Sequence, residues 1–419
     1  MNSLSLLSLI VLGLAVQVGL YLGIVFWRHW RDYQALRGRD EELKLPPPRL
    51  VPEGDEPAAP AWQGFRSFRV ERKVFEDILQ SVCSFHLVPE DGQALPGFLP
   101  GQFLTFRFDV PTANGSTEQI IRCYSLSDAP RAEGYRISVK RVLAPAGSGL
   151  PPGRASGFLH DHVEVGSRLA LRAPSGHFRI DRSDAPVVLI GGGIGITPML
   201  SMANWCLAEQ PGREVWLFYG VRNSREMIMK PALEGLAAAH PNFNLRVCFS
   251  NPLPEDVAVR DYQHQSRVDL NVLRMQLPLK TYQFYICGPN PMMESLVPAL
   301  EDWGVPDARI HFEAFGPASV KRRSAAAVTG VADEAGIVVN FAKSGKVLSW
   351  RPASGSLLEF AEANGIAVDS GCRAGGCGSC QTTIQAGEVA YSQAPDFDPE
   401  PGSCLLCVCT PKSNVTLEA

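Results

Sequence analysis

Six of the eleven cysteines lie between Cys372 and Cys409, and their spacing constrains the fold more than any other feature of the sequence. Cys377 follows Cys372 after four residues, Cys380 follows after two more, and the segment CLLCVC comes later. Three closely spaced thiols and one distant thiol form the ligand pattern of a [2Fe–2S] cluster. A structural zinc site, the main alternative, normally uses two short cysteine pairs. We therefore predict an iron–sulfur cluster at this position.

The identity of the fourth cluster ligand comes from a resemblance. Residues 335–419 resemble plant-type ferredoxins, which implies a β-grasp domain whose last ligand lies in a Leu-x-Cys-Val-like stretch. The letters LLCV make Cys407 the match, while Cys404 and Cys409 stay open as alternatives. The resemblance thus implies metal ligation by Cys372, Cys377, Cys380 and Cys407.

The remaining cysteines are scattered singly, and we interpret them as small buried core residues. They are Cys83, Cys123, Cys206, Cys248 and Cys287. A further role is predicted below for Cys287 alone.

A flavin site is predicted at Arg122-Cys-Tyr124-Ser125-Leu126, which resembles the R-x-Y-S motif of the ferredoxin–NADP⁺ reductase superfamily. An arginine can pair with the flavin pyrophosphate, while the tyrosine packs against the ring system and the serine bonds near its N5 edge. The alternative is an exposed arginine and a core tyrosine in an ordinary strand.

Two later segments lie where this superfamily places its other flavin contacts. One contains Val139 and Lys140, and the other runs from Gly153 through Ser156. Backbone amides at Gly153 to Ser156 can bind a phosphate. Around them, residues 64–182 alternate short apolar segments with turn signals, which predicts an antiparallel β-barrel that binds FAD.

Residues 183–316 are predicted to form a doubly wound parallel sheet that binds a nicotinamide nucleotide. The segment GGGIGITPML departs from the G-x-G-x-x-G fingerprint because Pro198 replaces the last glycine. It matches the strand-to-helix turn of the reductase superfamily. That resemblance implies that the pyrophosphate approaches the backbone of Gly191, Gly193 and Gly195, and that Thr197 lies beside the nicotinamide.

The end of this domain carries two further motifs of the superfamily. Cys287-Gly288-Pro289 resembles its C-G-P turn, which implies that Cys287 lies near the reactive carbon of the nicotinamide. Glu313 and Phe315 resemble the acidic and aromatic residues that approach the flavin. A buried thiol and a core phenylalanine are the alternatives. The predicted catalytic residues are Cys287, Ser125, Thr197 and Glu313.

The choice between NADH and NADPH depends on the segment VRNSREMIMK. Ser224, Arg225 and Lys230 could bind a 2′-phosphate, which leans slightly toward NADPH, although such residues are also common on surfaces.

The first residues predict a membrane anchor. Leu4 to Trp27 contains no charged residue and is long enough to cross a bilayer as a helix. A cleaved signal peptide fits less well, because no lysine or arginine precedes the apolar run. Arginines follow it from Arg28 onward, which favours a single-pass membrane protein with its catalytic body in the cytoplasm.

The whole chain is thus predicted to be multidomain, with α/β and β parts. The predicted parts are an anchor (1–30), a juxtamembrane segment with a proline-rich linker (31–63), an FAD-binding barrel (64–182), an NAD(P)-binding domain (183–316), a linker (317–334) and a [2Fe–2S] domain (335–419).

This order resembles oxygenase reductases and hybrid-cluster-protein reductases. It implies that hydride passes from NAD(P)H to FAD, and single electrons then pass through the cluster to an acceptor protein. The anchor favours a membrane-associated oxygenase, hydroxylase or desaturase as that acceptor. An alternative is the input subunit of a respiratory complex such as the sodium-pumping quinone reductase, although that subunit has its ferredoxin domain first. A net charge of −4 gives no basic footprint for nucleic acid.

Replacement of Cys377 by serine should separate the two halves of this electron path. Serine is a poor substitute for a soft thiolate ligand, so a cluster-dependent acceptor should no longer be reduced. Ferricyanide, which can draw electrons from the flavin, should still be reduced. Cys407→Ser should behave in the same way and Cys404→Ser should be mild, as measured by steady-state assays and iron content. Loss of iron from the Cys404 variant alone would reverse the choice of fourth ligand.

Overall fold

A computed structural model describes residues 62–419, apart from residues 113, 145–146, 148–150, 316–335, 374, 393–394 and 396. The chain divides into two units, residues 1–58 and 59–419. In the first unit only Gln17, Gly19, Gly23, Trp27 and Trp30 are described, each of them helical and exposed. Most of the predicted anchor, most of the first predicted linker and all of the second therefore lie outside the described residues. No helix within the described part is long and apolar enough to span a bilayer.

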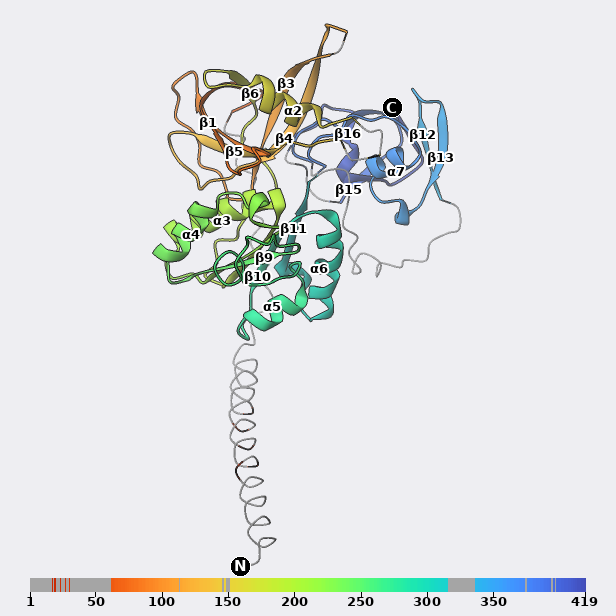
Figure 1. The fold of residues 1–419 in the computed structure, drawn as a ribbon. Helices are drawn as coiled ribbons and strands as arrows, with labels where there is room; N and C mark the ends of the chain where they lie inside the picture. Colours follow the sequence, from red (N-terminus) through yellow and green to blue (C-terminus); the bar gives the residue numbers. More distant parts are fainter. Residues whose placement is uncertain are drawn as a thin grey trace, which may run out of the picture. The chain divides into compact units, whose positions relative to one another are not determined.

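The flavin-motif region folds as a six-stranded antiparallel sheet that curls into a barrel-like domain (Figure 1). Its strands follow the order β4-β3-β6-β1-β2-β5. They are β1 (Arg66–Phe75), β2 (Val82–Pro89), β3 (Phe103–Pro111), β4 (Thr117–Ser125), β5 (Tyr135–Lys140) and β6 (Arg168–Leu171). A bridge between Leu126 and Ile137 links the ends of β4 and β5.

Alternation along these strands builds the core of the barrel, because every second side chain points inward. Phe68, Phe85, Phe106 and Phe108 are buried in one cluster. Helix α2 (Arg154–His162) packs against β3 and β5.

The next segment forms a five-stranded parallel sheet in the order β11-β10-β7-β8-β9. Its strands are β7 (Val187–Gly192), β8 (Val215–Val221), β9 (Phe243–Phe249), β10 (Gln283–Gly288) and β11 (Ile310–Ala314). The connections contain α3 (Ile196–Glu209), α4 (Lys230–Ala239), α5 (Leu270–Gln276) and α6 (Asn290–Asp302), with short 3₁₀ turns η1 (Gly193–Gly195), η2 (Ser224–Glu226) and η3 (Asp307–Arg309).

Helices cover both faces of this sheet, as Figure 1 shows. Val187 and Leu189 on β7 pack into the cluster that includes α3 and α4, whereas Val188 and Ile190 pack into the cluster that includes α5 and α6. Burial on both faces explains the continuous apolar run of this strand. Strand order reverses between β7 and β10, and in such sheets ligands bind at the carboxyl ends of the strands at that reversal.

The C-terminal segment forms a mixed sheet in the order β13-β12-β18-β14-β16, with a small ladder of β15 and β17. The elements are β12 (Ile337–Phe341), β13 (Lys346–Trp350), η5 (Pro352–Ser354), α7 (Leu357–Ala363), β14 (Gln381–Ala386), β15 (Val389–Tyr391), β16 (Ser403–Leu405), η6 (Leu406–Val408), β17 (Cys409–Pro411) and β18 (Val415–Leu417). Strands β12 and β13 pair as an antiparallel hairpin.

The single helix of this domain begins at a capping box. The Oγ of Ser356 accepts from the Glu359 amide at 3.2 Å, and the Glu359 carboxylate accepts from the Ser356 amide at 2.8 Å. Leu357, Leu358 and Phe360 then bury one side of α7 in the domain core. One helix packed with a mixed sheet is the arrangement that the predicted β-grasp domain requires.

Candidate active site and metal centre

The barrel and the parallel sheet meet at Ser125 and Glu313. Ser125 ends β4 and is buried, and its Oγ donates to Oε2 of Glu313 at 3.4 Å. Glu313 lies on β11, directly beside Cys287 in the register of β10 and β11. Three of the four predicted catalytic residues are therefore neighbours, although they come from three strands.

Desolvation dominates the electrostatics of this group. Although the side chain of Glu313 keeps some exposure, loss of hydration raises the pKa of its carboxyl to about 8, and the hydrogen bond from Ser125 opposes this only in part. Burial also raises the pKa of the Cys287 thiol, and the charge of Glu313 adds to that effect. At neutral pH the site thus holds one protonated carboxyl and one protonated thiol.

The glycine turn brings the predicted nucleotide residues to the same edge of the sheet. A Cβ on Gly195 would lie 2.1 Å from the carbonyl oxygen of Cys287, so only glycine permits this approach of helix start to strand end. Gly193 has a φ of +54° with open space around it, which leaves its backbone accessible. Thr197 is buried and its Oγ1 donates to the Ile194 carbonyl at 3.1 Å.

The predicted role of Gly195 therefore needs refinement. Its missing side chain serves the packing of the turn against Cys287, whereas the open backbone of Gly193 suits a pyrophosphate. Gly192 is equally constrained, because a Cβ there would lie 2.7 Å from Pro289.

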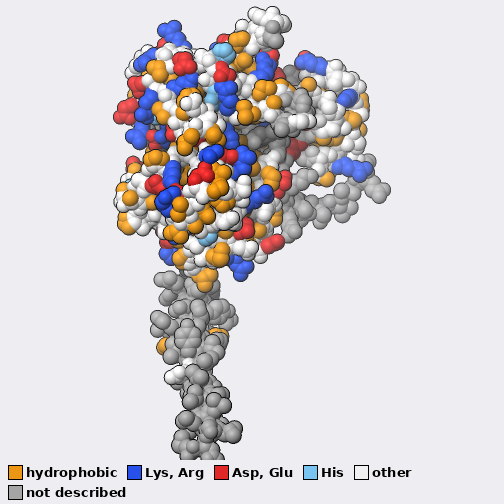
Figure 2. All heavy atoms as spheres, in the orientation of Figure 1, with side chains coloured by type: hydrophobic (Ala, Val, Ile, Leu, Met, Phe, Trp, Pro, Cys, Tyr) orange, Lys and Arg blue, Asp and Glu red, His pale blue; other side chains and the backbone are white. Residues whose placement is uncertain are grey.

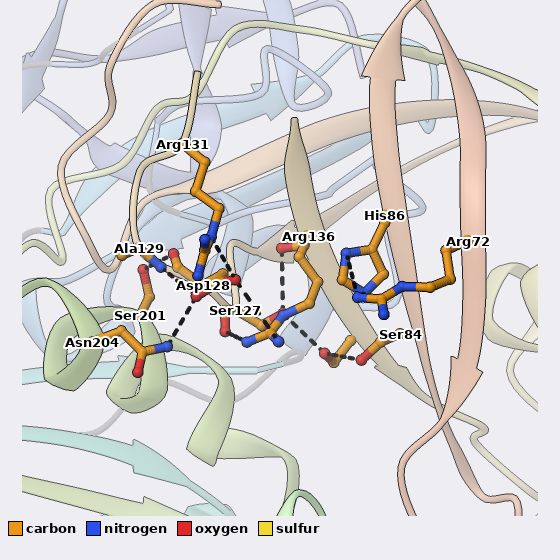
Figure 3. A network of polar contacts seen from close by, with 11 residues as sticks. Arg72, Ser84, His86, Ser127, Asp128, Ala129, Arg131, Arg136, Ser201 and Asn204 are labelled. Carbon is orange, nitrogen blue, oxygen red and sulfur yellow. Dashed lines mark hydrogen bonds and ion pairs between the residues drawn. The ribbon is translucent and has the colours of Figure 1, made fainter. Parts of the chain in front are cut away.

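Asp128, three residues after Ser125, ties the flavin motif to helix α3, as Figure 3 shows. The Oγ of Ser201 donates to the Asp128 carbonyl at 2.7 Å, and Nδ2 of Asn204 donates to Oδ1 of Asp128 at 2.9 Å. Because α3 starts at the glycine turn, Asp128 links the two predicted cofactor motifs. No short motif signalled this residue.

The predicted phosphate contacts surround the start of α2. Gly153 is the N-cap of α2 and has no side chain to cap the first amides, which are left for an anion. The Oγ of Ser156 donates to the Gly153 carbonyl at 3.0 Å and accepts from the Val142 amide at 3.1 Å. Ser156 thus holds the turn in shape. Arg122 is exposed, with Nη1 donating to the Ile121 carbonyl at 2.7 Å.

The remaining flavin candidates line the barrel. Tyr124 lies edge-on to Phe106, with ring centroids 5.8 Å apart, and burial raises the pKa of its hydroxyl. Leu126 and Val139 are buried, and Lys140 follows at the end of β5.

The nucleotide-specificity candidates already have acidic partners. Nη2 of Arg225 lies 2.8 Å from Oε1 of Glu255, and Nζ of Lys230 lies 2.6 Å from Oδ1 of Asp261. The Ser224 amide donates to Asp256 at 3.4 Å.

Two further candidates of the nucleotide domain, Pro289 and Phe315, lie outside the segment that carries Ser224, Arg225 and Lys230. Pro289 follows β10 as the N-cap of α6, and Phe315 is 41% exposed just after β11.

The loop that carries Cys372, Cys377 and Cys380, called the cluster loop below, places backbone amides around the sulfurs. The amide of Cys372 donates to Sγ of Cys377 at 3.2 Å, and the amide of Gly376 donates to Sγ of Cys372 at 3.2 Å. Gly375 and Gly378 adopt positive φ, which lets the loop turn sharply. Hydrogen bonding from Cys123 and then Cys372 lowers the pKa of the Cys377 thiol. Thiols with inward-pointing amides fit an iron–sulfur cluster.

The three late cysteines occupy two different positions in the ferredoxin domain. The thiols of Cys407 and Cys380 hydrogen-bond to each other, which lowers the pKa of Cys380. Cys404 and Cys409 are fully buried in the domain core and contact each other. The geometry therefore favours Cys407 over its two neighbours as the fourth ligand.

Cys123 corrects the interpretation of the scattered cysteines as core residues. It is only half-buried, and its Sγ forms a group with those of Cys372 and Cys377 in which all three sulfurs lie within 4.8 Å of one another. Its position between Arg122 and Tyr124 places it on the opposite face of β4. Sequence offered no sign of what packs on that face.

Comparison with known families agrees with these three domains. Residues 70–180 match an oxidoreductase FAD-binding domain, residues 189–297 an oxidoreductase NAD-binding domain, and residues 342–412 a 2Fe-2S iron-sulfur cluster binding domain.

Individual relatives cover different parts of the chain. The flavohemoprotein of Halalkalibacterium halodurans is 39% identical over 259 residues, which are 61% of each chain, so this chain spans less than two thirds of that relative. The FAD/NAD binding domain of a Vibrio cholerae nitric oxide dioxygenase is 35% identical, with a TM-score of 0.52, and is covered completely by 61% of this chain. Phthalate dioxygenase reductase is 27% identical with a TM-score of 0.50, covering 85% of this chain and 98% of its own.

The chain therefore belongs to the ferredoxin-reductase type of NAD(P)H-dependent oxidoreductases. More particularly, it joins ferredoxin reductase-like FAD- and NAD-binding domains to a C-terminal 2Fe-2S ferredoxin domain, and in this it is similar to phthalate dioxygenase reductase. Its cofactors are FAD, a [2Fe–2S] cluster and NAD(P)H.

Glu313→Gln should remove a pH dependence of stability. Since folding raises the pKa of Glu313 from 4.5 to about 8, its stabilising effect is complete below pH 4.5 and is lost as pH rises through 8. The glutamine variant stays neutral, so its melting temperature should gain on that of the wild type as pH increases over this range. A difference in melting temperature between the two proteins that stays constant from acid to alkaline pH would contradict the assignment.

Asp128→Ala should weaken the link between barrel and parallel sheet. Asn204 and other partly buried donors lose their acceptor, so the free energy of unfolding should fall by about 1–3 kcal/mol and flavin reduction by nucleotide should slow. Arg131→Ala is the matched control. It removes an ion pair to Asp128 from a side chain that is 63% exposed and should cost less than about 0.5 kcal/mol. Equal effects of the two variants in chemical denaturation would argue against the link.

Proposed function

We propose that this chain is a membrane-anchored reductase that delivers single electrons from a nicotinamide nucleotide to an acceptor protein in or on the same membrane. Hydride goes from the nucleotide to FAD, and electrons then leave one at a time through the cluster. The observation that carries this proposal is the contact between the flavin-motif strand and the cluster loop, at Cys123, Cys372 and Cys377. A flavin is needed between the other two carriers because a nicotinamide gives up two electrons together, whereas a cluster accepts one.

The predicted residues then have distinct roles. Arg122 and Tyr124 hold FAD, and the open turn at Gly193 receives the pyrophosphate of the nucleotide. The flavin and nicotinamide rings are positioned by Ser125, Cys287 and Thr197. Glu313, neutral at physiological pH, holds a proton beside Ser125 without adding a charge to the site.

The membrane part of the proposal rests on the sequence. The uncharged run from Leu4 to Trp27, followed by arginines, supports a single helix with the catalytic body on the cytoplasmic side. Tethering raises the effective concentration of the reductase at an acceptor in the same bilayer. We therefore favour an oxygenase, hydroxylase or desaturase of the membrane as the acceptor.

The nucleotide is proposed to be NADH. Arg225 and Lys230, the residues that leaned toward NADPH, are each paired with a carboxylate. A 2′-phosphate would have to compete with Glu255 and Asp261 for these cations, and it would be repelled by both carboxylates. On the face seen in Figure 2, Lys and Arg side chains lie among Asp and Glu side chains.

Deletion of residues 1–39 tests the proposal. The full chain should sediment with membranes, whereas the truncated chain should be soluble with the same rate of NADH-dependent ferricyanide reduction, because the anchor supplies no active-site residue. The truncated protein should also show a higher kcat/KM with NADH than with NADPH. A mature N-terminus near residue 20 would instead indicate cleavage, and a truncated chain that stays in the membrane would exclude the anchor.

A further inference from the structure

Arg172 crosses from the flavin barrel to the cluster loop. It follows β6, and its backbone amide donates to the Thr105 carbonyl on β3 at 2.9 Å, so its backbone is held by the barrel. Its Nη1 donates to the carbonyl oxygen of Cys377 at 2.8 Å. The side chain thus joins the barrel directly to a predicted ligand of the cluster.

Aromatic rings from both domains contact the same guanidinium. Its centre lies 4.8 Å from the ring centroid of Phe65 beside the barrel and 4.8 Å from that of Phe397 in the ferredoxin domain. Phe397 packs against the loop, because its amide donates to the Gly375 carbonyl at 3.0 Å and its ring would lie 2.6 Å from a Cβ on Gly378. A planar guanidinium suits this stacked position, and lysine does not.

This position costs Arg172 part of its hydration. Burial lowers the pKa of its guanidinium, and among the described residues no group accepts a hydrogen bond from its buried Nε. A buried donor without an acceptor is unfavourable, so another contact must hold Arg172 in this position. Arg107 already lies over Phe65 at 4.5 Å, so packing on that ring does not require a second arginine. The contact that distinguishes Arg172 is the one with the cluster loop.

Cys123 approaches the loop from the same side of the barrel. Its Sγ lies within 4.8 Å of the sulfurs of Cys372 and Cys377, and it also contacts Oγ1 of Thr105 at 3.5 Å. Cys377 is therefore contacted by the barrel at two atoms, its carbonyl oxygen and its sulfur. Cys123 lies next to Tyr124 in the flavin motif. Its contact with Cys372 and Cys377 therefore places the cluster loop against strand β4.

We propose that Arg172 is the positioning residue that seats the cluster loop on the flavin barrel and thereby sets the rate of electron transfer from flavin to cluster. Each hydride would bring two electrons to bound FAD, and these would pass one at a time through the cluster to the acceptor, while the single proton would leave to solvent once per cycle. No bond in the chain forms or breaks. The proposal rests on the electron path of the proposed function.

The test uses the full chain loaded with FAD and cluster, mixed anaerobically with NADH. In Arg172→Met the rate of flavin reduction should equal that of the wild type, while the following reduction of the cluster should slow roughly tenfold or more, because small misplacements of reacting groups are costly. Arg172→Lys keeps the charge without the planar fork and should be intermediate. Arg107→Met, the matched control on the same ring, should stay within about twofold of the wild type.

The midpoint potential of the cluster provides a second readout. Loss of a positive charge beside Cys377 should shift the potential to more negative values in Arg172→Met, whereas Arg107→Met should leave it unchanged. Wild-type cluster reduction and potential in Arg172→Met would overturn the proposal. Should that variant fail to keep its iron, Arg172→Lys decides, and a wild-type rate there would overturn it equally. Absence of cluster reduction in the wild type would instead refute the electron path itself.

Discussion

Alternation of side chains along strand β4 is the constraint on which all three cofactor sites depend. Arg122 and Tyr124 share one face of this strand, and Cys123 and Ser125 share the other. From that second face Cys123 contacts the cluster cysteines and Ser125 contacts Glu313. Four consecutive residues therefore serve the flavin, the cluster and the nucleotide. A slip of one residue in the pairing of β4 with β3 would exchange the two faces and separate the three sites.

Within the parallel-sheet domain the glycine turn packs directly against the backbone at the end of β10. The close approach of Gly195 to the Cys287 carbonyl places the start of α3 against the end of β10, at the reversal of strand order. Register with β11 then fixes Glu313 beside Cys287. The ladder fixes the backbone of both residues, and the hydrogen bond from Ser125 then holds the Glu313 side chain. Such rigidity suits hydride transfer, which requires the donor and acceptor rings to meet in one geometry.

The hydride site at Glu313 and the cluster site differ in how the protein stabilises charge. The hydrogen-bond partner of Glu313 is the neutral Ser125, and its raised pKa keeps the carboxyl neutral, so the hydride site gains no net charge. Around the cluster the opposite holds. Backbone amides and Arg172 direct positive charge toward thiolates that carry negative charge when they bind iron. The same low-dielectric surroundings thus favour a neutral carboxyl in one place and a stabilised thiolate in the other.

The sequence by itself determined whatever depends on residues close together in the chain. Cysteine spacing predicted the cluster, and the resemblance of GGGIGITPML to the reductase superfamily implied the strand-to-helix turn. The ferredoxin resemblance implied Cys407 as the fourth ligand, and the contact of Cys407 with Cys380 agrees with it. Tertiary structure alone decided what Cys123 contacts and why Arg172 and Asp128 matter. Arg172 and Cys377 are 205 residues apart in the chain, and Ser125 and Glu313 are 188 apart. Local patterns carry no information about such pairs, because their contact depends on how separately formed domains pack.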